Sequence, residues 1–187
     1  WLSSIAFSDV NGDGHEDVLI TGLKDITGFS RIAKLYTNDG MGNFTEVTGT
    51  PFDGVLDASV AFSDVDGDGL DDVLITGENK PDKRIAKLYT NDGMGNFTEK
   101  TGTPFDGIQY GSVAFSDVNG DGHNDVLITG RNNSDQEIAK LYTNNGMGDF
   151  IEKTDIPFEG VSLGSIAFSD VNGDEQDDVL ITGNNNA

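Results

Sequence analysis

The chain has 187 residues, of which 33 are acidic and 11 are basic, so its formal net charge is −22. This charge argues against nucleic acid as a partner, because phosphate binding needs clustered lysine and arginine side chains. The sequence contains no cysteine, which excludes disulfides and thiolate metal sites. No apolar run approaches the ~18 residues of a membrane-spanning helix. The chain starts at Trp1 without an initiator methionine or a recognisable signal peptide, which suggests a processed or excised piece.

Taken in order, the sequence consists of four units of one repeat: 4–58, 59–111, 112–164 and a truncated unit 165–187. Each complete unit holds four short alternating segments that are separated by turn residues, which predicts four β-strands per unit. No segment keeps a helical period over about ten residues. The sequence therefore predicts an all-β protein that forms a single repeat array over residues 1–187.

Four antiparallel strands repeated about every 50 residues are typical of a β-propeller blade. In the second unit we expect the strands at 60–62, 73–76, 85–89 and 97–99. Most phenylalanines recur in register with the repeat, which favours packing between neighbouring blades. A stacked β-solenoid usually has shorter coils and a β-sandwich needs ~100 residues, so both fit the spacing less well. The prediction is three blades and the first two strands of a fourth.

Between its first and second strands, each unit carries the pattern Asp-x-Asn/Asp-x-Asp-x-x-x-Asp. Short carboxylates at alternate positions, with glycine allowing a sharp bend, suit a hard cation that takes about six to eight oxygen ligands. A plain hairpin turn needs one or two such residues, and it needs no cluster of carboxylates that repel one another. We therefore expect up to four Ca²⁺ ions, one per loop, held by side chains and by the backbone carbonyl at the seventh position. The expected ligands are Asp9, Asn11, Asp13, His15 and Asp17; Asp64, Asp66, Asp68, Leu70 and Asp72; Asp117, Asn119, Asp121, His123 and Asp125; and Asp170, Asn172, Asp174, Gln176 and Asp178.

The fourth loop departs from this pattern, because Glu175 stands where the other three loops have glycine. If that position requires a positive φ, glutamate is strained there. An EF-hand is excluded, because its twelfth position needs a bidentate glutamate between two helices, and these loops have an isoleucine inside a strand. His15 and His123 are expected to bind through their carbonyls, which leaves their side chains as incidental surface groups.

The segment 59–77, SVAFSDVDGDGLDDVLITG, resembles the FG-GAP repeat of integrin α-subunit β-propellers. The segment 88–98, LYTNDGMGNFT, resembles the related bacterial FG-GAP/VCBS repeats. The resemblance extends over essentially the whole chain, although the Gly-Ala-Pro element of the family is not conspicuous. It implies a propeller fold, calcium in the loop between the first two strands, and an extracellular location. Family members include adhesion proteins, propeller lectins and non-catalytic modules of secreted enzymes, so the resemblance leaves the ligand open.

Three and a half blades leave an open sheet edge, whereas propellers close into rings of about four to eight blades. Either the chain is a fragment of a longer array, or copies assemble, for instance as a homodimer that completes a propeller. Two chains together supply enough strands for a ring, but the order in which these strands are connected does not fit one. This favours a fragment of a longer array. We expect a secreted or cell-surface protein, because loops with about three carboxylates bind calcium in the weaker, extracellular range of roughly 10⁻⁴–10⁻³ M.

The loops that differ among the units are expected on the rim opposite the acidic loops, and function commonly lies on variable loops. Trp1, Phe29 and Tyr110 lie outside the repeat register and are expected on that rim, where sugars or protein side chains can stack on them. Alternatively, they fill local gaps or cover the end of the chain.

These patterns predict an extracellular calcium-binding β-propeller module for adhesion or ligand binding, with an extracellular protein or glycan as its partner. The alternatives are a carbohydrate-binding propeller lectin, and a structural spacer or non-catalytic module of a secreted enzyme. We expect no enzymatic activity, because no Ser/His/Asp or Cys/His set is apparent and the carboxylate pairs belong to the metal loops.

Overall fold

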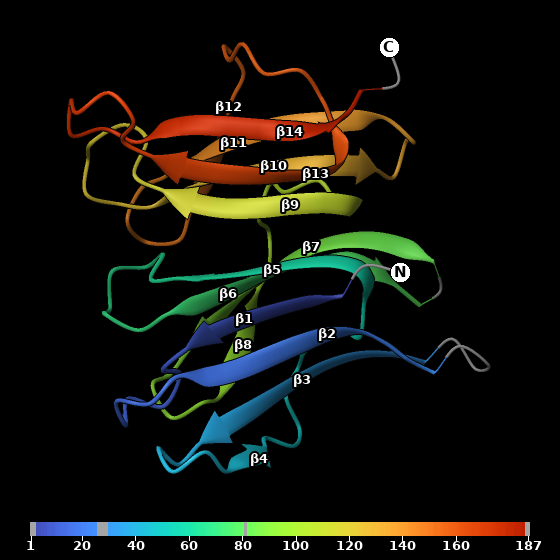
Figure 1. The fold of residues 1–187 in the computed structure, drawn as a ribbon, viewed down its shortest axis with the longest axis vertical. Helices are drawn as coiled ribbons and strands as arrows, with labels where there is room; N and C mark the ends of the chain where they lie inside the picture. Colours follow the sequence, from blue (N-terminus) through green and yellow to red (C-terminus); the bar gives the residue numbers. More distant parts are fainter. Residues whose placement is uncertain (1–2, 26–29, 81, 186–187) are drawn as a thin grey trace.

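The structure is a computed structural model that describes residues 3–25, 30–80 and 82–185. These residues form fourteen β-strands and no helix (Figure 1). Accordingly, no helix within the described ranges is long and apolar enough to cross a membrane. The strands are β1 (Ser4–Ser8), β2 (Asp17–Asp25), β3 (Ser30–Asn38), β4 (Phe44–Glu46), β5 (Leu56–Ser63), β6 (Asp72–Asn79), β7 (Lys83–Asn91), β8 (Phe97–Lys100), β9 (Ile108–Ser116), β10 (Asp125–Asn132), β11 (Glu137–Asn144), β12 (Phe150–Lys153), β13 (Ser162–Ser169) and β14 (Asp178–Asn184).

The strands form consecutive antiparallel sets in which neighbours along the chain are neighbours in the sheet. The strands β1 to β4 form the first blade, β5 to β8 the second and β9 to β12 the third, while β13 and β14 form a half blade. The pair Ile85 and Ile108 bridges the second and third blades. Figure 1 shows the first blade at one end of the molecule and the half blade at the other. The predicted all-β fold, with three four-stranded blades and half of a fourth, is confirmed.

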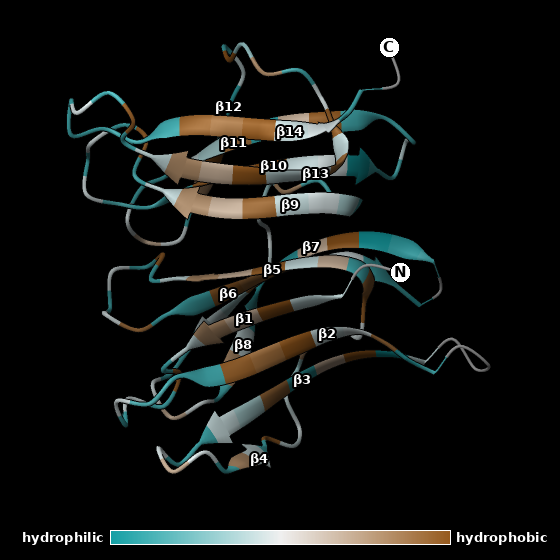
Figure 2. Cartoon of the chain, in the orientation of Figure 1, coloured by the Kyte–Doolittle hydropathy of each residue, from teal (hydrophilic) through white to brown (hydrophobic). Residues whose placement is uncertain are grey.

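The second strands of the second and third blades, β6 and β10, are buried on both faces, because a neighbouring blade covers each face. In β6, both Leu74 and Ile75 are fully buried. Ile75 packs into a cluster shared with the first blade, and Leu74 packs into a cluster shared with the third. Figure 2 shows the corresponding hydrophobic stretches on β2 and β14. The core is thus built between blades, which explains why the Val-Leu-Ile run is continuous rather than alternating.

A β-bulge lengthens the first strands beyond the sequence-based prediction. The strand β5 starts at Leu56, and its pairing with β6 shifts register just after that residue. The bulge residues Asp57 and Tyr110 have φ angles of 50° and 53°. Opposite the first bulge, Gly77 has a φ of 142°, and a Cβ atom there would lie 2.8 Å from the Leu56 carbonyl oxygen. This close approach is the reason that glycine follows Val-Leu-Ile-Thr in the repeat.

Phenylalanines of the Pro-Phe-x-Gly connectors pack onto the next blade. Phe52 meets the ring of Tyr89 edge-on at a centroid distance of 5.0 Å, and Phe105 meets Tyr142 in the same way at 5.1 Å. Such edge-to-face pairs are stabilising beyond the area they bury. For these two residues, the predicted role of repeated aromatics in packing between blades is confirmed.

The two end faces of the array expose apolar side chains whose counterparts inside it are buried or half-buried. On the first blade, Ile5 and Phe7 are 57% and 59% exposed. On the half blade, Leu180 is 63% exposed, whereas the equivalent leucines of the complete blades, Leu19, Leu74 and Leu127, are all 0% exposed. A blade therefore buries its apolar surface only where another blade packs against it.

Candidate metal loops

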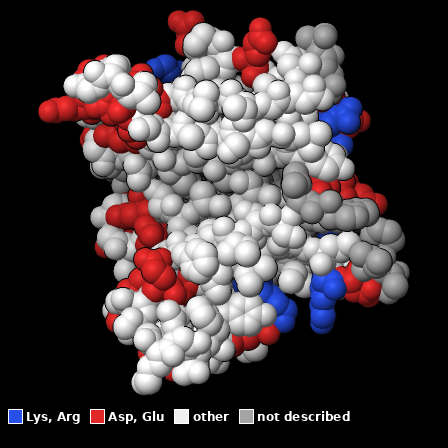
Figure 3. Space-filling model, in the orientation of Figure 1, with Lys and Arg blue, Asp and Glu red and all other residues white. Residues whose placement is uncertain are grey.

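The acidic loops occupy residues 9–16, 64–71, 117–124 and 170–177, each between the first and second strands of its blade. All four lie on the same side of the molecule, at the left in Figure 1. Figure 3 shows acidic side chains gathered along this side. The fold therefore places the four predicted loops on one rim, as expected for turns that repeat at the same point of each blade.

The first aspartate of each loop folds the loop around its own carboxylate. In the first loop, the N–H groups of Gly12 and Gly14 donate to the Asp9 carboxylate at 2.8 and 2.7 Å. The third and fifth positions accept hydrogen bonds in the same way, because the Asp13 N–H donates to Asn11 and the His15 N–H donates to Asp13, both at 2.9 Å. These local hydrogen bonds bring the oxygen-bearing side chains to one side of the loop. Equivalent bonds to the first aspartate recur in the other loops, on Asp64, Asp117 and Asp170.

The last aspartate of each complete loop is a buried carboxylate with two backbone donors. Asp72 is 1% exposed, and its two oxygens accept from the N–H groups of Val65 at 3.2 Å and Asn91 at 2.9 Å. Asp17 and Asp125 are buried in the same way. Each carboxylate oxygen has two lone pairs, so these bonds leave acceptor capacity for a cation.

The second loop brings three carboxylates together. Asp64, Asp66 and Asp72 each offer a carboxylate oxygen within 4.8 Å of the others. One of the Asp66 oxygens, Oδ1, is buried and has no hydrogen-bond partner. An ionised oxygen in that state is costly unless a cation or a proton neutralises it. The donor set consists of hard oxygens only, so these residues fit Ca²⁺.

The side chain at the seventh position of the loop points to the glycine-rich turn of the same blade. A Cβ atom at Gly40 would lie 2.3 Å from Nε2 of His15, and one at Gly146 would lie 2.4 Å from Cε1 of His123. In the second loop, Leu70 lies over Gly93 in the same manner. This packing leaves the backbone carbonyl as the group that the seventh position can offer to an ion, and its role as a ligand stays a prediction.

Burial dominates the electrostatics of the loops. It raises the pKa of Asp72 to about 7, although hydrogen bonds from two backbone N–H groups act in the opposite direction. Burial likewise raises the pKa values of Asp17, Asp66 and Asp125. At the first position of the fourth loop, by contrast, backbone N–H donors lower the pKa of Asp170. Without a cation, the buried loops therefore resist ionisation at their inner carboxylates.

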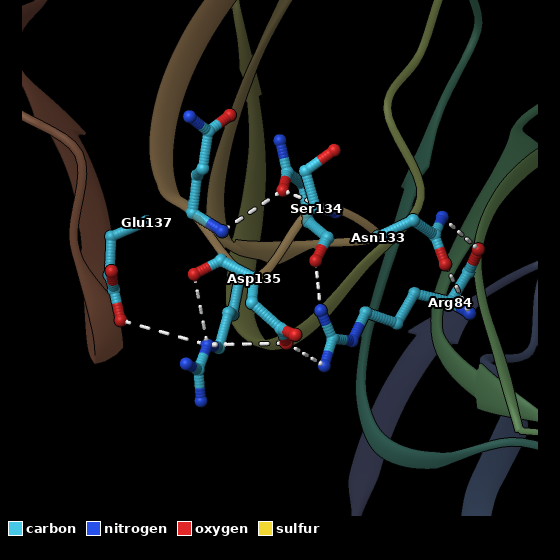
Figure 4. A network of polar contacts seen from close by, with 8 residues as sticks. Arg84, Asn133, Ser134, Asp135 and Glu137 are labelled. Atoms are coloured by element: carbon cyan, nitrogen blue, oxygen red, sulfur yellow. Dashed lines mark hydrogen bonds and ion pairs between the residues drawn. The ribbon is translucent and has the colours of Figure 1, made fainter.

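The opposite rim holds cross-blade contacts made by arginine. Arg84 on β7 reaches the loop between β10 and β11, where its guanidinium donates to Asp135 at 2.7 Å and its backbone pairs with the Asn133 amide at 3.0 and 3.1 Å (Figure 4). Arg31 contacts the second blade in the same way, with Glu78 at 2.6 Å. These contacts were not foreseen from the sequence, because each joins residues of two different units.

Of the three aromatic residues expected on the variable rim, Trp1 and Phe29 lie outside the described residues. Tyr110 lies in β9 at the bulge, where it is half-buried and its phenol bonds to the Asp57 carboxylate of the preceding blade. Its location near the arginine contacts agrees with the expected rim, and its role in ligand binding stays a prediction.

The buried carboxylate of Asp72 should make the metal-free protein less stable as the pH rises. With its pKa raised to about 7, the folded state keeps a proton that the unfolded chain releases near pH ~3.9, so stability is lost between these two values. In chelator, we expect the melting temperature to be roughly 3–6 °C higher at pH 5 than at pH 7.5. Asp66→Asn copies the asparagine of the other loops and should shrink this difference, because the Asp66 charge helps to raise the pKa of Asp72. Asp155→Asn, at an exposed connector, should leave the difference unchanged, and equal behaviour of both variants would contradict the assignment.

Backbone strain at Glu175 yields a second prediction. Its φ is 67°, and the glycines at this position in the other loops have φ angles of 84°, 86° and 88°, so the fourth loop keeps the left-handed turn with the wrong residue. Glu175→Gly should raise the free energy of unfolding by about 1 kcal/mol, measured by urea denaturation. Glu175→Ala removes the charge but keeps the Cβ atom and is the matched control. A gain from alanine as large as that from glycine would show that charge, and not the backbone, is responsible.

Comparison with known proteins agrees with this geometry. No curated protein matches the chain significantly. Among solved structures, a fucose lectin from Kordia zhangzhouensis in complex with methyl-fucoside is similar in fold, with a TM-score of 0.51 and 12% identity over 82% of this chain and 98% of that chain. Three overlapping segments, 9–75, 64–128 and 117–181, match the model of the FG-GAP-like repeat. Because these segments span most of the sequence and each covers two successive acidic loops, the chain belongs to the FG-GAP-like repeat family.

Proposed function

We propose that the protein is an extracellular, non-catalytic binding module whose blades are held in place by calcium. The observation that carries the proposal is the second loop, where three carboxylates converge and one buried Asp66 oxygen has no partner. Membership of the FG-GAP-like repeat family supports the same conclusion. The secreted or cell-surface setting follows from the proposed weak calcium sites, which need the millimolar calcium found outside cells.

Calcium would be held by the side chains at positions one, three, five and nine of each loop and by the carbonyl at position seven. A bound ion supplies positive charge to carboxylates that otherwise repel one another across a small loop. The chain itself supplies the rest, because the backbone N–H groups orient the carboxylates before any ion arrives. Since the ion binds only the folded loop, it adds stability in proportion to the logarithm of its concentration.

We assign partner binding to the surfaces that the calcium loops leave free. One is the rim opposite the loops, which carries the loops of variable sequence and Tyr110. The others are the two exposed end faces, marked by Ile5 and Leu180, which would pack against a further blade from a longer chain or from a second copy. An extracellular protein or a glycan remains the proposed ligand of the variable rim.

Calcium should raise the melting temperature. Saturation of one site at about 100 times its Kd adds about 2.7 kcal/mol, so we expect a rise of roughly 5–10 °C between chelator and excess calcium, measured by differential scanning calorimetry. Asp66→Ala should reduce this rise, and Asp155→Ala, a carboxylate outside the loops, should not. An unchanged melting temperature with and without calcium would remove the proposed structural metal.

A carbohydrate-binding lectin is the second candidate, because one hollow recurs in each complete blade between the third strand and the Pro-Phe-x-Gly connector. Its volume is 330, 360 and 340 Å³ in the first, second and third blades. Each hollow is lined by a phenylalanine and a lysine, a combination that can stack on a sugar ring and donate to its hydroxyls. These residues are Phe52 and Lys34, Phe105 and Lys87, and Phe158 and Lys140. The likeness in fold to a fucose lectin supports this candidate.

If the hollows bind sugar, a glycan array should show hits that free methyl-fucoside or a related sugar competes away. Simultaneous replacement of Lys34, Lys87 and Lys140 by alanine should weaken that binding by about tenfold, whereas Lys24→Ala, at an exposed lysine outside the hollows, should leave it unchanged. An array without hits would exclude the lectin and would leave the calcium-dependent module standing.

A further inference from the structure

A buried asparagine at the end of the third strand connects the acidic loops of neighbouring blades. Asn91, the last residue of β7, donates its backbone N–H to the Asp72 carboxylate at 2.9 Å. Its side-chain amide donates across the blade boundary to the Val10 carbonyl of the first loop at 3.0 Å. Asn91 therefore touches a candidate ligand of one loop and the backbone of another.

Asn144 makes the same two bonds one blade further along. Its backbone N–H donates to the Asp125 carboxylate at 2.8 Å, and its side-chain amide donates to the Val65 carbonyl of the second loop at 2.8 Å. Val65 in turn donates its own N–H to Asp72 at 3.2 Å. The bonds thus form one continuous series through three loops, and both asparagines are less than a tenth exposed.

The bond to the valine carbonyl acts on a candidate ligand. The Val65 carbonyl belongs to the peptide group that carries the Asp66 N–H, and Asp66 is the residue with the unpartnered buried oxygen. By holding that peptide, Asn144 sets the direction from which the Asp66 side chain enters the second loop. Asn91 holds the peptide between Val10 and Asn11 in the same manner.

We propose that Asn91 and Asn144 are positioning residues that couple calcium binding between neighbouring loops, an inference that rests on the proposed calcium function. An ion at Asp72 fixes the carboxylate that anchors the Asn91 N–H, and the fixed Asn91 amide holds the first loop in its ion-binding form. In an ion-free loop, mutual repulsion of the carboxylates loosens the same anchor. Because coupling is reciprocal, an ion in the first loop raises the affinity of the second by the same factor, typically about 5-fold or more.

Asn38 provides a matched control within the chain. It occupies the same position in the first blade, where its backbone N–H donates to Asp17 at 2.8 Å and its amide donates to the Glu16 carbonyl at 3.2 Å. Both partners belong to its own blade, and no hydrogen bond of Asn38 to another blade is found among the described residues. Its replacement therefore removes the local role of this asparagine without touching a coupling contact.

The first experiment weakens calcium binding at the second loop and measures the calcium affinity of the first loop. Asp68 is exposed and takes no part in the series of bonds, so Asp68→Ala weakens the second site while the fold is kept. Calcium titrations followed by NMR, with the amides of Gly14 and Gly122 as reporters, give the affinities of the first and third loops separately. We expect Asp68→Ala to weaken calcium binding at the first loop by at least about 5-fold. An unchanged affinity at the first loop would overturn the coupling.

The second experiment completes a double-mutant cycle. In an Asn91→Ala background, Asp68→Ala should change the affinity of the first loop by less than about 2-fold, whereas in an Asn38→Ala background the full effect should remain. Equal effects in the two backgrounds would assign the asparagines a purely local role. The proposed function fails separately: if none of the reporter amides shifts with calcium, the loops bind no ion, whereas shifts that saturate independently leave calcium binding intact and overturn only the coupling.

Discussion

The carboxylate that ends each complete acidic loop is buried, and it accepts N–H groups from two directions. In the second blade, the Asp72 carboxylate accepts hydrogen bonds from the N–H of Val65 in its own loop and from the N–H of Asn91 at the end of the third strand. One side chain therefore closes the loop, ties it to the sheet and, through Asn91, ties it to the neighbouring blade. A buried carboxylate is costly without such partners, so the loop, the strand end and the blade contact depend on one another.

The second source of stability is the apolar packing between stacked blades. Among the described residues, each cluster of buried apolar side chains contains residues of two neighbouring blades, so the core lies between blades rather than within them. Stability of this kind is a sum of blade and interface contributions, as in other repeat proteins. It also explains why the equivalent leucines of the Val-Leu-Ile-Thr-Gly segments are buried in the three complete blades and exposed in the half blade.

The two rims of the array are organised by different chemistry. On the loop rim, short acidic side chains repeat with little variation and are arranged by backbone N–H groups. On the opposite rim, the long side chains of Arg31 and Arg84 reach into the next blade and pair there with aspartates at equivalent positions, Asp82 and Asp135, while the remaining loop residues differ between the units. A repeated ion site suits the first arrangement, and a surface that varies from blade to blade suits the recognition of a partner.

The sequence alone determined the strand order, the number of blades and the position of the acidic loops, because turn residues and strand periodicity are local properties repeated in register. It also identified Glu175 as a residue in a glycine position, and its φ of 67° agrees. Only the tertiary structure decided which contacts cross between blades. The roles of Asn91 and Asn144, the bulge at Asp57 and the ion pair of Arg84 depend on residues far apart in the chain, and no local pattern encodes which of them become neighbours.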